Sequence, residues 1–188
     1  IPCILLVYEE PSVFGININN EEKTENIPIN FSVSEAIKTK ALWILAIGTG
    51  VLYFFHSGIN THHAAFLLDR NISIGFSALA ISINAFSTGL GSYVWGLICD
   101  RVNIKYAFSA VFVCSMIALL VLIYTFDIYL AILSSIFFGF AMGGMLTVPS
   151  VAYANFYGTD SLGKIRGITN PITTIGAATG VMVSGIIF

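Results

Sequence analysis

Five long uncharged stretches divide this chain, and charged residues stand only between them or before them. No charged side chain occurs between Lys40 and Asp69, between Arg70 and Asp100, or in three further stretches towards the C-terminus. A helix rising about 1.5 Å per residue needs about 20 residues to cross a hydrocarbon core, and each stretch is long enough. We therefore predict five membrane-spanning helices, at residues 41–67, 73–98, 105–125, 129–156 and 167–188.

The same pattern excludes a membrane β-barrel. A barrel strand alternates apolar and polar residues over about ten positions, whereas these apolar stretches run much further without alternation. The composition agrees, with 56% hydrophobic and 10% charged residues, where a soluble domain has about 25% charged. The sequence predicts an all-α fold, a polytopic bundle of membrane helices in contact with a lipid bilayer.

The first 40 residues differ from the rest. Residues 1–8 have the character of the end of a preceding membrane helix, and residues 9–40 form a polar linker with few apolar side chains. Within the linker, residues 34–40 are typical of a short amphipathic helix that leads into the first span. The chain begins at Ile1 and ends inside an apolar run at Phe188. We interpret it as a fragment of a longer membrane protein.

The basic residues predict the orientation, because loops rich in Lys and Arg remain in the cytoplasm. If the linker 9–40 is cytoplasmic, only Arg70 faces outside. The seven basic residues that then lie inside are Lys23, Lys38, Lys40, Arg101, Lys105, Lys164 and Arg166. The plasma membrane is the expected location.

Polar residues recur along one face of the first span. The steps of four and three between them place them on one side of a helix: Thr49, Tyr53, His56, Asn60 and His63. Such a stripe avoids lipid, so it lines a substrate path or a hydrogen-bonded contact between helices. Histidines 62 and 63 are expected to reach water near the outer end.

Other spans carry polar and small residues with the same two interpretations, a cavity wall or a close helix crossing. We add four polar residues to the predicted substrate path: Asn84, Thr88, Thr147 and Ser150. Glycines four positions apart let neighbouring helices approach closely, which predicts packing at Gly139 with Gly143 and at Gly176 with Gly180. The third span has few polar residues and is expected to face lipid as support.

The chain lacks the residues that a metal site, a membrane enzyme or a nucleic-acid surface would need. The histidines have no cysteine or carboxylate nearby that would complete a zinc site, so we expect neither a metal nor a cofactor. A membrane enzyme would need carboxylates or a nucleophile at membrane depth, yet all ten Asp and Glu lie in loops or the linker. A net charge of −2 without clustered basic residues gives no surface for nucleic acid.

The segment between the second and third spans carries a family resemblance. Residues 96–105, Gly-Leu-Ile-Cys-Asp-Arg-Val-Asn-Ile-Lys, resemble the cytoplasmic loop signature of the major facilitator superfamily. The matching positions are Gly96, Asp100, Arg101 and Lys105. Asn103 replaces the usual second glycine, which we attribute to the tolerance of Asn for left-handed backbone.

The resemblance has consequences for the whole chain. It implies that the linker joins two six-helix halves and that the five spans belong to the C-terminal half, which lacks its last helix here. The N-terminal half would then be the partner of these helices. Asp100 lies beyond the expected end of its own helix, and the resemblance implies that it gates transport through contact with that other half.

Residues 38–43 and 58–70 look most like the monocarboxylate and oxalate–formate branch. Members of that branch carry an arginine in helix eight, whereas Ser92 stands near this position. The expected function is secondary active transport of a small-molecule substrate by alternating access, with a small organic anion such as a monocarboxylate as substrate and His56 carrying a coupling proton. A non-transporting sensor on the same fold and a membrane enzyme are the alternatives.

Overall fold

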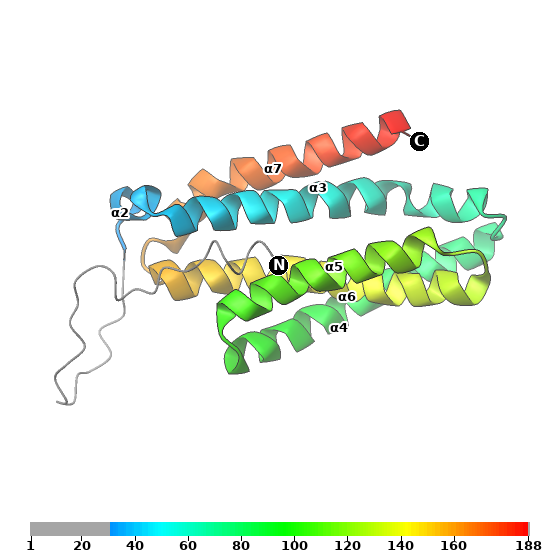
Figure 1. Cartoon of the computed structure of the whole chain (residues 1–188), viewed down its shortest axis with the longest axis horizontal. Coiled ribbons are helices and arrows are strands. Elements are labelled where there is room, and N and C mark those ends of the chain that lie inside the picture. Colours follow the sequence, from blue (N-terminus) through cyan, green and yellow to red (C-terminus); the bar gives the residue numbers. More distant parts are fainter. Residues whose placement is uncertain (1–30, 188) are drawn as a thin grey trace.

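The computed structural model of the protein describes residues 31–187. Within this range the chain is helical and has no strand, and five of its helices are long and apolar enough to cross a membrane. Figure 1 shows the helices α2 (Val33–Lys38), α3 (Lys40–Asp69), α4 (Ile74–Arg101), α5 (Ile104–Ile123), α6 (Ile128–Tyr157) and α7 (Leu162–Ile187). The predicted helix end at residues 1–8 and most of the linker lie outside the described residues.

Two predicted helix boundaries are wrong by several residues. The last span was expected from residue 167, but α7 begins at Leu162, and α4 continues through Asp100 to Arg101. Charged residues mark where a helix leaves the hydrocarbon, but the helical hydrogen bonds continue beyond that point. The connection between α6 and α7 therefore has only four residues, and it starts at Gly158, whose positive φ of 77° ends α6.

Helix α6 lies at the centre of the bundle and packs against both α4 and α5. Helix α7 instead runs beside α3, on the side away from α4 (Figure 1). The largest group of buried apolar side chains fills the space between α3, α4, α5 and α6 and includes Trp95, Phe108, Val111 and Met145. The bundle thus has a three-helix part, α4–α5–α6, and a pair, α3–α7.

Glycines bring both groups of helices close together. A methyl group at Gly143 would come within 2.6 Å of the Thr88 carbonyl oxygen, and one at Gly180 within 2.9 Å of the Phe54 Cα. Gly139 lies against Asn84 in the same way, and Gly176 lies against Gly50. The four glycines that the sequence assigns to packing thus lie at the α4–α6 and α3–α7 crossings, where there is no room for a side chain.

The two ends of the bundle are held by different contacts. At the α2 end, the Tyr157 hydroxyl lies 2.7 Å from the Thr39 hydroxyl, and the Tyr157 carbonyl accepts a hydrogen bond from the Phe31 amide. At the opposite end, the Arg70 guanidinium lies over the rings of Phe66 and Phe126, 5.1 and 4.9 Å from their centroids. These contacts fix the segments that enter α3 and leave it.

Candidate functional site

A groove with a volume of about 450 Å³ lies between α3, α6 and α7. Helix α3 contributes Tyr53, Ser57 and Asn60 to its lining, and the other two helices contribute mostly methionine and alanine side chains together with Thr174. It forms where α7 contacts α3 closely but touches α6 little, so the third side remains open. The groove combines apolar walls with a few polar groups, as sites for small molecules generally do.

A narrower pocket of about 30 Å³ continues from this groove towards the α2 end. Tyr53, Met145 and Leu146 line both spaces, so the two are neighbours. Thr49 and Ser150 lie in the narrow pocket, but their hydroxyl groups donate to the carbonyls one turn earlier, at distances of 2.6 and 3.2 Å. The lone pairs of both oxygens remain able to accept hydrogen bonds.

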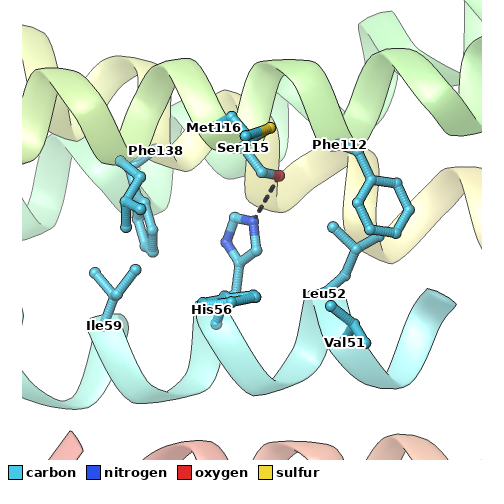
Figure 2. A pocket seen from close by; sticks show the side chains of 10 residues that line it. Val51, Leu52, His56, Ile59, Phe112, Ser115, Met116 and Phe138 are labelled. Carbon is cyan, nitrogen blue, oxygen red and sulfur yellow. Dashed lines mark hydrogen bonds between the residues drawn. The ribbon is translucent and has the colours of Figure 1, made fainter. Parts of the chain in front are cut away.

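His56 lies between the groove and a second, apolar pocket of about 250 Å³ formed by α3, α5 and α6. Figure 2 shows its ring directed at Ser115 on α5, with Nε2 2.9 Å from the Ser115 hydroxyl oxygen. Ser115 donates its own proton to the Val111 carbonyl, which leaves only its lone pairs for His56. With the Ser115 proton on the Val111 carbonyl, we assign the imidazole proton to Nε2, which makes Nδ1 an acceptor.

The imidazole of His56 is almost fully enclosed. Only 2% of the residue is exposed, its ring centroid lies 4.8 Å from that of Phe138, and Nδ1 has no hydrogen-bond partner among the described residues. A buried acceptor without a partner is unfavourable, so Nδ1 favours any donor that reaches it. A ligand, a water molecule or a proton could serve as this partner.

His63 does not reach water as expected, since it is 2% exposed and packs beside Phe138. Helix α6 covers this face of α3, which the sequence pattern could not indicate. No group of three or more metal-ligating side chains occurs among residues 31–187.

Asn84, Thr88 and Thr147 lie apart from the groove, in the contact between α4 and α6. The Thr147 hydroxyl donates to the Ser92 carbonyl at 3.4 Å, and the Thr88 hydroxyl donates to the Asn84 carbonyl at 2.9 Å. Trp95 adds a hydrogen bond from Nε1 to the Phe140 carbonyl at 3.1 Å. These residues therefore belong to a close helix crossing and not to a cavity wall.

The segment with Gly96 and Asp100 differs from expectation in two details. Asp100 and Arg101 are exposed but belong to the last turn of α4, rather than lying beyond it. Asn103 has φ −55° and not a left-handed backbone, and its side chain caps α5 by accepting a hydrogen bond from the Lys105 amide at 3.1 Å. Capping the next helix explains an Asn at this position better than backbone tolerance does.

Sequence reasoning missed two residues of the candidate site. Ser115 belongs to the span expected to face lipid, and its pairing with His56 joins positions far apart in the chain. Arg166 was placed in a loop, but it lies in α7 and lines the narrow pocket. The Gly158 turn signal just after Tyr157 could have indicated that α7 starts early enough to include Arg166.

The sequence model of a family described as Major Facilitator Superfamily matches residues 3–188, which is nearly the entire chain. No curated protein matches the chain.

Proposed function

The chain belongs to the Major Facilitator Superfamily, whose members are membrane transporters, and we propose that it carries a small solute through the groove between α3, α6 and α7 by secondary active transport. The observation that carries this proposal is the groove itself, a space of about 450 Å³ whose apolar walls include several polar groups, within helices long enough to span a membrane. Polar side chains at membrane depth are typical of substrate paths.

Alternating access requires parts that move as near-rigid bodies around a central site. The close crossing of α4 with α6 is suited to a rigid part, because its glycines leave no space for rearrangement. Asp100 on the exposed last turn of α4 is the proposed gate, together with Gly96, Arg101 and Lys105. A carboxylate at a helix C-terminus is electrostatically unfavourable, which supports a role towards another part of the protein.

The proposed substrate is a small organic anion such as a monocarboxylate, moved together with a proton. His56 is the proposed proton carrier because its Nδ1 is buried, is an acceptor and has no partner among residues 31–187. An imidazole is the side chain whose ordinary pKa lies closest to neutral pH. The proposed location is the plasma membrane, with linker 9–40 in the cytoplasm.

Uptake of radiolabelled lactate into proteoliposomes, with and without an inward proton gradient, tests this function. We expect His56→Ala to weaken the apparent affinity, and His56→Gln to keep uptake but lose its response to the gradient. His63→Gln is the matched control, since His63 is equally buried but does not line the groove. Asp100→Asn should slow uptake and leave membrane insertion intact.

Each result has a clear reading. Gradient-dependent uptake by His56→Gln would show that His56 does not carry the coupling proton. Normal uptake rates in Asp100→Asn would show that Asp100 does not gate transport. Binding of lactate without any uptake by the unmodified protein would instead identify a sensor.

The orientation is tested separately by cysteine labelling in cells. Asn71→Cys should react with an impermeant maleimide added outside, and Asn103→Cys only after permeabilisation. Both positions are exposed at opposite ends of α4, so each is the control for the other. Reversed labelling would place the linker outside the cell.

A further inference from the structure

Arg166 brings a positive charge to the narrow pocket beside the substrate groove, from a position that the sequence assigns to a loop. It lies in the second turn of α7, is half-buried, and lines the narrow pocket of about 30 Å³. Neither aspartate nor glutamate lines this pocket, and the other α7 side chains in it are Thr169, Asn170 and Thr173. The pocket therefore has a positive charge and several polar groups.

A second hydrogen-bond donor faces the same pocket. Tyr153 on α6 is only 3% exposed, and its hydroxyl has no hydrogen-bond partner among the described residues. Its neighbours Thr49 and Thr169 each donate to a backbone carbonyl instead. The lone pairs of these two hydroxyls are close enough to interact with the Tyr153 proton, but no hydrogen bond of good geometry forms, so a ligand oxygen that reaches the phenol would be the better acceptor.

We propose that Arg166 and Tyr153 form an anion-binding subsite, which holds the carboxylate of a small monocarboxylic acid. A guanidinium binds a carboxylate through two parallel hydrogen bonds, and the phenol supplies a third to either oxygen. The pocket has a volume of about 30 Å³, against about 450 Å³ for the adjoining groove. The pocket therefore accepts the charged end of an acid, but not its carbon chain.

The adjoining groove accommodates the rest of such a molecule. Met142, Met145 and Ala177 give it apolar walls directly beside the narrow pocket. No second lysine or arginine lines either space, so a second carboxylate would lie in a groove without a matching charge. The lining thus selects one carboxylate on a short, mostly apolar body.

This subsite rests on the proposed transport function and names the residues that give it charge selectivity. The test compares lactate with lactamide, its uncharged counterpart, by thermal stabilisation of the purified protein in nanodiscs. The unmodified protein should bind lactate more tightly than lactamide. Arg166→Gln should weaken lactate binding by about tenfold to a hundredfold, as expected for a lost charged hydrogen bond, and leave lactamide binding unchanged.

The controls separate a general charge effect from a specific contact. Lys164→Gln removes an exposed cation two residues away, which does not line the pocket, and should preserve the preference for lactate. Arg166→Lys should restore part of it, and Tyr153→Phe should reduce it less than Arg166→Gln does.

Equal binding of lactate and lactamide by the unmodified protein would overturn the proposal. An unchanged preference in Arg166→Gln, or an equal loss in Lys164→Gln, would overturn it as well. Because binding is measured without transport, a protein that prefers lactate in this test but shows no uptake would retain the subsite and lose the transport function.

Discussion

The α4–α6 crossing and the α3–α6–α7 groove contain the same kinds of residue and differ in structure. Both combine glycine, serine, threonine and asparagine in membrane helices. In the crossing, Gly139 and Gly143 bring backbones together and the hydroxyl of Thr147 bonds to the neighbouring helix. In the groove, α7 approaches α3 closely through Gly176 and Gly180 but leaves a gap to α6.

The difference lies in how many helices meet. Two helices joined by small residues exclude everything else, whereas a third helix displaced to one side leaves a space that polar side chains then line. Helix α6 takes part in both regions, with Thr147 facing α4 and Ser150 facing the narrow pocket. A polar stripe in a membrane helix therefore indicates contact with protein or water without deciding which.

The largest expected effect tests whether the α4–α6 crossing is a fixed contact. Gly143→Val places side-chain atoms against backbone atoms of Thr88 and Gly91, which cannot move aside as a flexible side chain would. We expect the free energy of unfolding to fall by about 3 kcal/mol or more, at the upper end of overpacking effects. Thermal unfolding in detergent measures it.

Gly89→Val is the matched control for this variant. Gly89 lies in α4, the helix that Gly143 of α6 contacts, but a methyl group there would meet nothing within 4 Å. The control should keep nearly normal stability. An equal loss of stability in both variants would mean that valine destabilises these helices at any position. The effect would then not be specific to the α4–α6 crossing.

A smaller effect is expected from Trp95→Phe in the same crossing. Phenylalanine keeps most of the apolar contact but loses the hydrogen bond from Nε1 to the Phe140 carbonyl, which contributes about 1 kcal/mol. We expect unfolding to become easier by about that amount while uptake rates stay normal. A large fall in uptake with unchanged stability would extend the functional site into the crossing.

Two isosteric substitutions compare the regions directly. Thr49→Val in the narrow pocket should lower uptake severalfold and reduce stability less than a change at the crossing does, because the Thr49 hydroxyl bonds only to a carbonyl of its own helix. Thr147→Val in the crossing should do the reverse, with up to about 1 kcal/mol of lost stability and normal uptake. The measurements are proteoliposome uptake and thermal unfolding of the same two preparations. Interchanged results would reverse the assignment of the two regions.

The smallest expected effect is a pH dependence of the α2 helix, which belongs to neither region. Glu35 accepts hydrogen bonds from the Ser32 hydroxyl and amide, which hold the pKa of its carboxyl below its ordinary value. The cap therefore stabilises α2 above the ordinary pKa, and the contribution is lost as pH falls through the lowered one. Acid should fray α2 alone, as followed by the Cα chemical shift of Ala36.

Glu35→Gln is the control for this titration. Glutamine can still accept from Ser32 but does not titrate, so the Ala36 shift should become independent of pH in the acid range. A pH-dependent shift that persists in the variant would assign the effect to another group.

The sequence predicts the helices well because the apolar stretches and their charged boundaries depend on the bilayer alone. It places Thr49, Tyr53, His56 and Asn60 correctly on one helix. It cannot separate the groove from the crossing, because that depends on where α7 lies relative to α6. Arg166 was missed for a different reason. The last span was expected to start just after this charged residue, but α7 begins at Leu162 and includes it.

Arg70 has a mechanical consequence for any motion of this bundle. Its guanidinium stacks on Phe66 in α3 and on Phe126 beside α6, and it donates to the Ile123 carbonyl at the end of α5. This end of α3 is thereby fastened to the α5–α6 hairpin. Spin labels placed at Leu68 and Tyr124 should report one narrow distance distribution throughout a transport cycle, so that the hinge for rocking must lie elsewhere.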